Sequence, residues 1–332
     1  MSRKLMLAHA LDRSGCGTLL RLTPSWRGVL ILNYHRIGEA RHSMLDRNLW
    51  SATTEEFDQQ IRTIVRDFDI IGLDELETAL HDRRGRSVMI TFDDGYLDNY
   101  TEAFPVLKSH RASATFFITT GFLDVPKIPW WDEMAWMVRS CRLPHLPQNP
   151  WTGGPVPFDE PDRERAIRRV LNAYKMLEGS STDEFIEVLA EKLETGRAPA
   201  HIGHELWMTW PMIREMSQSR MFFGGHTVNH PILANLTPEA QDFEIGECRR
   251  RLMQELKQPV DAFSYPVGGH TSFNQATRDA LAKHGYRWAF TYVGGVASQL
   301  QLDPFAIQRS AVESDTVRPI FRAMLTLPHF FA

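Results

Sequence analysis

Residues Ser87–Tyr96, SVMITFDDGY, form a short apolar run that leads directly into two adjacent carboxylates. The run Ser87–Phe92 has the composition of a buried β-strand, so Asp93 and Asp94 are expected at its carboxyl end. In parallel α/β architectures, this end of the strands forms the mouth where ligands bind. Two neighbouring acids repel each other unless a cation or a shared proton relieves them, so the pattern predicts a metal site.

A second apolar run, Met221–Pro231 (MFFGGHTVNHP), ends in two histidines. His226 and His230 are four residues apart, so on one helical turn both imidazoles would face the same way, and Pro231 would discourage the helix from continuing. Together with Asp94 they would supply one carboxylate and two imidazoles. Three protein ligands with open coordination positions are typical of catalytic zinc sites, whereas structural zinc sites are closed.

These two segments resemble the first two signatures of the nodulation-type polysaccharide deacetylases, carbohydrate esterase family four. A third segment, Ala262–Gly269 (AFSYPVGG), is similar to the family's third signature, although Ser264 stands where the family usually carries an arginine. The resemblance covers residues 29–312. It implies a distorted (β/α) barrel of about seven parallel strands and a metal-dependent deacetylase.

Each segment alone also has an ordinary interpretation. Asp94-Gly95 alone is a favoured hairpin turn, and a pair of histidines is more often found at a surface or a cap than at a metal. The segment from Ser264 to Gly269 is also simply a strand that ends in a loop. These ordinary interpretations require three coincidences at strand ends, so the joint interpretation as one metal centre is favoured.

The resemblance assigns roles to residues beside the ligands. It implies that Asp93 is the general base rather than a ligand, and that the backbone N–H of Val267, directly after Pro266, donates to the oxyanion. Because the usual arginine is missing, Arg309 at the end of another predicted strand is a candidate substitute that orients the base. An ordinary surface or salt-bridged arginine is the alternative. A divalent metal is expected, zinc first, with cobalt, nickel or manganese as alternatives.

The general acid has two candidates. Family members of the usual layout supply a histidine from a Leu-x-His segment, and Leu327–His329 matches it in letters close to the end of the chain. His35 follows a predicted strand before the Asp-Asp motif, and exopolysaccharide-associated relatives with a permuted motif order carry a Tyr-His pair there. We favour His35 over His329, because an imidazole must lie at the mouth to donate a proton at neutral pH.

Aromatic residues of the same segments are candidates for substrate contact. Trp131 could stack on a sugar ring, although tryptophans are as often part of a core. Tyr96, Tyr265 and Pro266 belong to the signatures and are further candidates.

The composition of the chain limits the classes of function and partner that are expected. With 332 residues, 43% apolar content and a net charge of -4, the chain can bury one large core and does not favour a nucleic-acid or anionic-membrane partner. An N-acetylated glycan is the expected partner. Cys16, Cys141 and Cys248 suggest no disulfide framework. Neither a convincing signal peptide nor an apolar stretch of about 20 residues is present, so a cytoplasmic protein without a transmembrane segment is expected.

Strand-like and helix-like runs alternate along the chain, which favours a parallel sheet wrapped by helices. Strands are predicted at 28–34, 87–92, 114–119, 221–224, 262–265, 287–293 and 305–312. Helices are predicted at 54–67, 100–109, 164–177, 182–195, 274–284 and 314–325, and from Thr237 as a cap. The predicted divisions are an N-terminal segment (1–27), a catalytic domain (28–313) with an insertion (121–205), and a C-terminal helix and tail (314–332). The pattern alone does not separate a barrel from an open doubly wound sheet.

The expected activity is metal-dependent removal of N-acetyl groups from GlcNAc-type residues of a polysaccharide or oligosaccharide, such as a chitooligosaccharide. An O-acetyl sugar esterase would use the same residues. The missing arginine also leaves open a glycan-binding pseudoenzyme. A non-haem iron oxygenase shares the ligand set of two histidines and a carboxylate, but it would not need Asp93.

Overall fold

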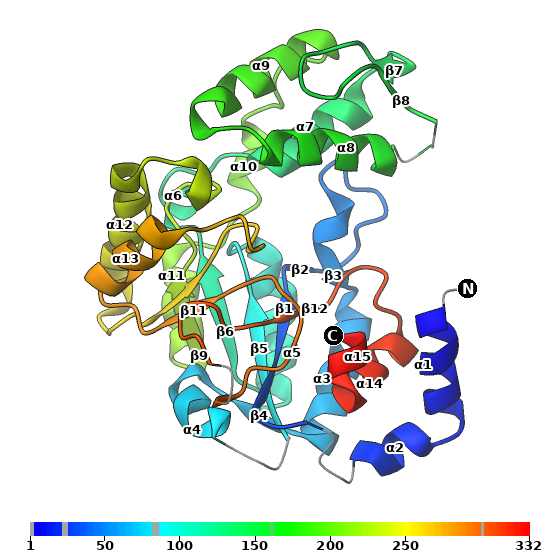
Figure 1. The fold of residues 1–332 in the computed structure, drawn as a ribbon, viewed down its shortest axis with the longest axis vertical. Coiled ribbons are helices and arrows are strands. Elements are labelled where there is room, and N and C mark those ends of the chain that lie inside the picture. The colour runs from blue at the N-terminus through cyan, green and yellow to red at the C-terminus, as the bar shows by residue number, and fades with distance from the viewer. Residues whose placement is uncertain (1–2, 22–25, 82–85, 160, 162, 300–301) are drawn as a thin grey trace.

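The computed structural model describes residues 3–21, 26–81, 86–159, 161, 163–299 and 302–332 of the chain. At its centre lies a parallel sheet in the order β11-β10-β9-β6-β5-β1-β12, with β4 also paired to β5 (Figure 1). The strands of this sheet are β1 (Val29–Tyr34), β4 (Asp69–Ile71), β5 (Ser87–Phe92), β6 (Ala114–Ile118), β9 (Met221–Gly225), β10 (Ala262–Ser264), β11 (Trp288–Phe290) and β12 (Ser310–Ala311). The sheet curls into the distorted (β/α) barrel that the family resemblance implies.

The register of the strands brings their carboxyl ends to one level. Strands β1 and β5 are buried along their whole length, as expected for parallel strands covered on both faces, and they pair from Val29 with Ser87 to Tyr34 with Phe92. Gly225 of β9 pairs with Ile118 of β6. The residues that directly follow β1, β5, β6, β9 and β10 therefore lie around one mouth. In this order they are His35, Asp93, Thr119, His226 and Tyr265.

The barrel is closed by residues 307–311. Ile307 forms a bridge with Phe290 of β11, whereas Ser310 and Ala311 pair with β1. Between them, the N–H of Arg309 donates to the carbonyl of Val293 at 3.0 Å. The continuous strand predicted at 305–312 is therefore wrong in extent, because this segment crosses from one edge of the sheet to the other and only β12 stays in a regular ladder.

Helices cover the outside of the barrel, and their starts follow the capping residues in the sequence. They are α3 (Thr54–Asp67), α4 (Leu76–Leu80), α5 (Phe104–Ser109) after the π-helical turn η3 (Asn99–Ala103), α11 (Trp210–Ser217), α12 (Pro238–Leu256) and α13 (Gln275–Lys283). Thr53 and Glu56 form a capping box at α3, and the hydroxyl of Thr237 caps α12. Short turns η1 (Arg47–Leu49), η2 (Leu73–Glu75) and η5 (Leu233–Asn235), with the strand pair β2 (Arg36–Ile37) and β3 (Trp50–Ala52), complete the loops.

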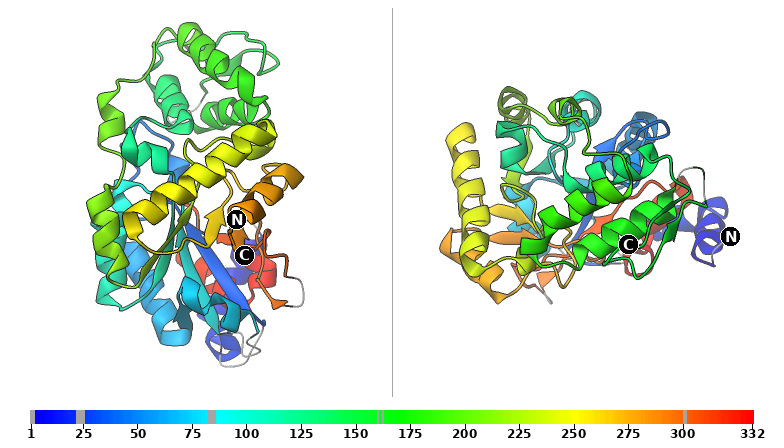
Figure 2. Two further views of the ribbon diagram at one scale, coloured as in Figure 1. Left: turned by 90° about the vertical axis from the view of Figure 1, so that its left-hand side faces the viewer. Right: turned by 90° about the horizontal axis from the view of Figure 1, so that it is seen from above.

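Between β6 and β9 the chain builds a group of helices. It contains α6 (Thr120–Asp124), α7 (Trp130–Ser140), α8 (Glu164–Lys175), η4 (Gly179–Ser181), α9 (Thr182–Lys192), α10 (His201–His204) and the antiparallel pair β7 (His145–Leu146) and β8 (Val156–Pro157). Helices α7, α8 and α9 lie above the carboxyl ends of the strands in Figure 1 and keep this place in the side view of Figure 2. This part of the chain is therefore placed to cover the mouth.

Helix α7 begins in a Pro/Trp-rich stretch of the region 121–205 that was predicted as an insertion. Pro129 is its N-cap and two tryptophans fill its first turn, so the composition at its start is that of a loop. The helix instead forms because Met134, Met137 and Val138 recur at helical spacing and are all buried.

The two ends of the described chain pack together beside the barrel. Helices α1 (Arg3–Arg13) and α2 (Cys16–Arg21) contact α14 (Arg318–Thr326), and α15 (Pro328–Phe331) follows. The helix predicted at 314–325 starts later, at Arg318, because Pro319 occupies the first helical turn. Among the described helices, none combines the length and the hydropathy needed to cross a bilayer.

The capping box of α3 gives a prediction about stability. Thr53 Oγ1 accepts from the N–H of Glu56 at 3.2 Å, and Glu56 Oε2 accepts from the N–H of Thr53 at 2.9 Å. We expect Thr53→Ala to lower the free energy of unfolding in urea by about 1 kcal/mol, because one helical N–H loses its acceptor. Thr53→Ser keeps the hydroxyl and should stay close to the native value. Equal losses in both variants would contradict the capping explanation.

Candidate metal centre and active site

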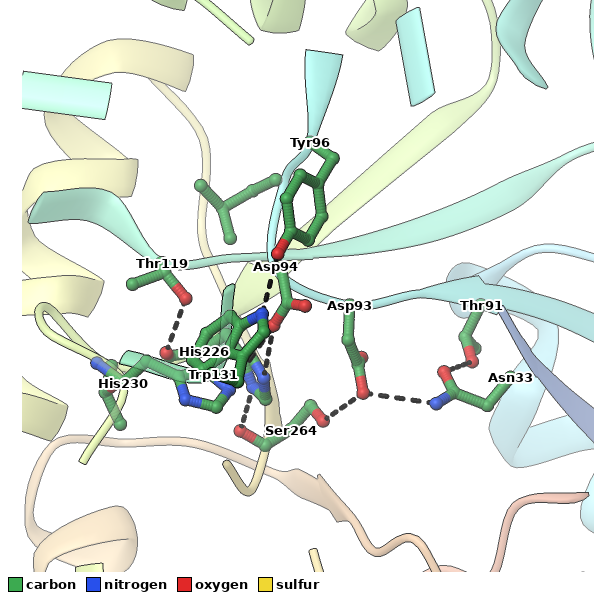
Figure 3. Close-up of polar contacts among 12 residues, drawn as sticks. Asn33, Thr91, Asp93, Asp94, Tyr96, Thr119, Trp131, His226, His230 and Ser264 are labelled. Carbon is green, nitrogen blue, oxygen red and sulfur yellow. Dashed lines mark hydrogen bonds and ion pairs between the residues drawn. The ribbon is translucent and has the colours of Figure 1, made fainter. Parts of the chain in front are cut away.

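One carboxylate and two imidazoles meet at the mouth of the barrel. Asp94 Oδ1 lies 3.3 Å from Nε2 of His226 and 3.3 Å from Nε2 of His230 (Figure 3). One ligand atom from each residue lies within 4.8 Å of the others, and all three side chains are buried. Asp94 Oδ1 has no hydrogen-bond partner among the described residues. A buried oxygen without a partner is costly, so Asp94 Oδ1 fits the role of a metal ligand.

The backbone around the ligands is not the one that the sequence predicts. Residues 226–230 do not form a helical turn, since Thr227 has a φ of 67° and His230 a φ of 57°. Their amides bond to side chains instead of helical carbonyls, and His230 N donates to Thr227 Oγ1 at 2.8 Å. The predicted helix is therefore wrong, although the two imidazoles still reach the same carboxylate.

A glutamate of α12 holds this loop. Glu244 is buried, and its Oε2 accepts from the amides of Val228 and Asn229 at 2.8 and 2.9 Å. Its Oε1 accepts from the side-chain amide of Asn229 at 2.8 Å. Glu244 was not predicted as part of the site. The available signal was an acidic residue on the buried face of a helix, between Gln241 and Ile245.

The imidazole of His226 is oriented as a ligand. Its Nδ1 lies 2.7 Å from the carbonyl oxygen of Ser264, and a carbonyl can only accept, so Nδ1 carries the proton. This leaves the lone pair of Nε2 directed at Asp94, the arrangement that metal-binding histidines commonly show. The ring of His230 packs 4.3 Å from the ring of Trp131.

Burial and the neighbouring charges shift the pKa values of the three ligands in different directions. Burial raises the pKa of Asp94, but the two imidazoles outweigh burial and the net pKa is lowered. Burial lowers the pKa of His226, but Asp93 and Asp94 outweigh it and the net pKa is raised. For His230 burial prevails and the pKa is lowered. The donor set therefore fits a divalent cation that replaces the protons, with zinc, cobalt, nickel and manganese all compatible with it.

Asp93 is held away from this centre by Arg309. Nη1 of Arg309 donates to Asp93 Oδ1 at 2.8 Å, and Nη2 donates to Oδ2 at 2.7 Å. Burial raises the pKa of Asp93, but Arg309 and His226 outweigh it, so the net pKa is lowered and the carboxylate is ionised at neutral pH. Ser264 Oγ accepts from Arg309 Nη2 at 2.8 Å. The guanidinium thus reaches the place where the family usually has an arginine two residues before the proline.

The surrounding strands fix Arg309 itself. Its Nε donates to the carbonyl of Thr291 at 3.0 Å, and its Nη1 donates to Asn33 Oδ1 at 2.7 Å. Asn33 Nδ2 in turn donates to Asp93 Oδ2 at 3.2 Å (Figure 3). Asn33 was not predicted as part of the site. An amide inside the apolar run of β1 was its only signal.

A cavity of about 530 Å³ opens onto both groups. Its lining includes the predicted site residues His35, Asp93, Asp94, Trp131, His226, His230, Tyr265 and Val267. Further wall residues come from η1, from α8 and from residues 313–315, together with Trp130 and Tyr292. The cavity is large enough for more than one sugar ring.

The structure places the two candidate acids very differently. His35 directly follows β1 and lines the cavity, with its ring 5.7 Å from the ring of Tyr292. His329 is exposed on α15, and it does not line the cavity. Position thus favours His35 as the proton donor.

The third signature turns sharply at the cavity. Val267 has a φ of 63°, a strained value for a β-branched residue, and its N–H donates no hydrogen bond to the described residues. The N–H of Gly268 instead donates to the carbonyl of buried Pro266 at 2.7 Å. The N–H of Val267 is therefore not used by another described residue, and its role as a donor to the oxyanion stays a prediction.

Two residues predicted to contact the substrate, Tyr96 and Trp131, instead contact other side chains of the site. Tyr96 is fully buried and does not line the cavity, because its hydroxyl donates to Asp132 at 2.8 Å and accepts from Trp131 Nε1 at 2.7 Å. Trp131 reaches the cavity but is only 5% exposed, so its ring supports His230 rather than offering a free face. Tyr265 lines the cavity, whereas Pro266 is buried and is not part of the lining.

Asp132 was not predicted either, and burial raises its pKa to about 7 in spite of Arg36. It connects α7 to the Asp-Asp motif through Tyr96. Its only signal in the sequence was its place next to the two tryptophans.

Comparisons with known proteins agree with this geometry. A family model described as polysaccharide deacetylase matches residues 81–141 and 167–289, more than half of the chain. YxkH of Bacillus subtilis, assigned to the polysaccharide deacetylases, is 25% identical over 216 residues, or 65% of this chain and 48% of YxkH. The poly-β-1,6-N-acetyl-D-glucosamine N-deacetylase of Staphylococcus aureus is 32% identical over 106 residues, or 28% of this chain and 36% of that protein. The matches thus span about half of one relative and a third of the other.

Solved structures share the fold. The Streptococcus pyogenes deacetylase PplD has a TM-score of 0.59 at 20% identity, covering 90% of this chain and 98% of PplD. IcaB from Ammonifex degensii has a TM-score of 0.57 at 19% identity, covering 91% of this chain and 98% of IcaB.

The metal centre gives a prediction about binding. We expect Asp94→Asn to weaken zinc binding by more than about tenfold, because it removes a charged ligand atom. Isothermal titration of the metal-free protein measures this change, with circular dichroism to confirm folding. Asp93→Asn is the matched control and should bind zinc nearly as the native protein does, since Arg309 keeps Asp93 off the centre. Equal weakening in both variants would contradict the ligand set.

The pair of Arg309 and Asp93 gives a prediction about stability. We expect Arg309→Met to lower the free energy of unfolding by about 3–5 kcal/mol, because it leaves a buried carboxylate without a counter-ion. Urea denaturation at neutral pH measures the loss. The double variant with Asp93→Asn should recover part of it, because the lone charge is gone. A single variant as stable as the native protein would show that the pair does not support the fold.

Proposed function

Because the chain belongs to the polysaccharide deacetylase family, we propose that it is a metal-dependent hydrolase that removes N-acetyl groups from GlcNAc-type sugars of a polysaccharide or oligosaccharide. One observation carries the proposal. The cavity joins a three-ligand centre to a second carboxylate, Asp93, which a buried arginine keeps ionised and apart from the ligands. An amide needs such a combination, since it is a poor electrophile with a poor leaving group.

Asp94, His226 and His230 would hold the divalent cation. When bound, it would supply Lewis acidity, which lowers the pKa of water and polarises the acetamide carbonyl. Zinc is the first candidate. The N-acetylglucosamine polymer named for the staphylococcal relative supports the sugar class.

Asp93 accepts the proton of the attacking water, and its two oxygens are not equivalent. Oδ2 accepts from Arg309, Asn33 and Ser264, which uses its lone pairs. Oδ1 accepts only from Arg309 Nη1 among the described residues. A lone pair therefore remains at Oδ1, and we assign the base function to this atom.

Two further groups complete the reaction. The N–H of Val267 donates to the oxygen of the acetamide as negative charge develops on it. His35 protonates the departing amine, from the side of the cavity that it shares with Tyr292. The arginine partner of Asp93 supports an enzyme over a glycan-binding pseudoenzyme, because it supplies what the third signature lacks.

Acetate release tests the proposal. We expect zinc-loaded protein to release acetate from N-acetylated chitooligosaccharides, measured by a coupled enzymatic assay with mass spectrometry of the sugar. Asp93→Asn and His35→Gln should each lower kcat by about 10²–10⁴-fold, because each removes a proton-transfer group.

His329→Gln is the matched control for His35, and it should keep the native kcat. No acetate from N-acetylated sugars under zinc, cobalt, nickel or manganese would overturn the proposal. Acetate from O-acetylated sugars alone would replace it by an esterase. An Asp93→Asn variant with full activity would contradict the role of the base.

A further inference from the structure

Helix α8 forms one wall of the active-site cavity. Four of its residues line the cavity, and they are spaced as one face of a helix: Arg168, Leu171, Asn172 and Lys175. The opposite face, with Ala166, Ile167 and Val170, is buried among the other helices of this part of the chain. The helix is therefore fixed by its apolar face, and it presents two cations to the cavity.

Arg168 and Lys175 differ from Arg165 and Arg169, the other two cations of the helix. Arg165 pairs with Asp159 at 2.9 Å, and Arg169 donates to the carbonyl of Thr152 at 2.6 Å. Neither Arg168 nor Lys175 has an ion-pair or hydrogen-bond partner within the part of the chain that the structure describes. Cations that line a cavity without partners are available to a ligand.

Lys175 is the more telling of the two because it is half-buried. Burial lowers its pKa, and Asp46, which also lines the cavity, only partly compensates. A cation that is partly withdrawn from water without a close counter-ion is unfavourable, and an arriving anion relieves that cost.

Three acids outside the catalytic centre also line the cavity, Asp46, Glu313 and Asp315, and among the described residues none of them forms an ion pair with Arg168 or Lys175. Asp46 Oδ1 accepts from the backbone and side-chain amides of Asn48, and Glu313 accepts from the hydroxyl of Tyr292 at 3.1 Å. Asp93 and Asp94 belong to the catalytic centre. Asp315 is exposed in the segment that follows β12. Arg168 and Lys175 are the arginine and lysine of the cavity lining, and both lie on α8.

We propose that Arg168 and Lys175 bind an anionic group, a carboxylate or a phosphate ester, carried by the glycan on a sugar near the one whose acetamide reaches Asp93. This inference rests on the proposed function, because it places an acetylated sugar in the cavity. Guanidinium and ammonium groups donate strong charge-assisted hydrogen bonds to both kinds of anion. The substrate class is thus an acidic N-acetylated glycan.

Three tetrasaccharides test the inference with the zinc-loaded protein. The first is neutral N-acetylchitotetraose, the second is the same sugar with one 6-phosphate, and the third alternates N-acetylglucosamine with glucuronic acid. We expect at least one acidic sugar to bind about tenfold more tightly than the neutral one in isothermal titration. One charge-assisted hydrogen bond changes the dissociation constant by about this factor. The advantage should shrink as salt is added. The second and third sugars tell which anion is preferred.

Variants on the same helix locate the effect. The double variant Arg168→Gln with Lys175→Gln should lose the tenfold advantage. Arg165→Gln, outside the cavity on the same helix, should keep it. Equal binding of neutral and acidic sugars by the native protein, or an advantage that survives the double variant, would overturn the inference.

Acetate release, recorded in parallel, separates this inference from the proposed function. If the protein prefers acidic sugars through α8 but releases no acetate from any of the three, the anion site is supported and the proposed hydrolase is contradicted. If the protein deacetylates all three sugars and binds them equally, the proposed hydrolase is supported and the anion site is contradicted.

Discussion

The buried ion pair between Arg309 and Asp93 joins the closure of the barrel to the chemistry at its mouth. Arg309 lies on the segment that passes from β11 to β1, and the side chains of the pair are 0% and 3% exposed. Without the guanidinium, burial would favour the protonated form of Asp93, which could not act as a base. The residue that keeps Asp93, the proposed base, ionised therefore belongs to the segment that closes the barrel. It also leaves Asp94 as the carboxylate that the histidines approach.

The centre also depends on backbone that is held in unfavourable conformations. Asp94, Thr227, His230 and Val267 have φ values of 78°, 67°, 57° and 63°. Such conformations cost on the order of 1–3 kcal/mol each and persist only where the surroundings impose them. Here Glu244 holds the histidine loop, and the N–H of Thr119 donates to the carbonyl of Asp94 at 3.2 Å. These contacts fix the backbone that carries the donor atoms.

The sequence predicted those parts of the structure that local patterns determine. Buried apolar runs located β1, β5 and β9, and polar residues directly after them located Asp94, His226 and His230, which meet in the structure. Local patterns could not predict contacts between distant segments. The turn after His226 depends on Glu244 of α12, and the burial of Tyr96 depends on Asp132 of α7. Arg309 could be suggested from its place at a strand end, but its two bonds to Asp93 exist only once the barrel closes.

X-ray diffraction from crystals of the zinc-loaded protein, recorded at the zinc absorption edge, tests most directly whether the mouth of the barrel is a metal centre with a separate base. We expect one anomalous peak bounded by Asp94, His226 and His230, with Asp93 still paired to Arg309. A peak elsewhere, or an Asp93 that has left Arg309 to bind the metal, would contradict this division between ligand and base.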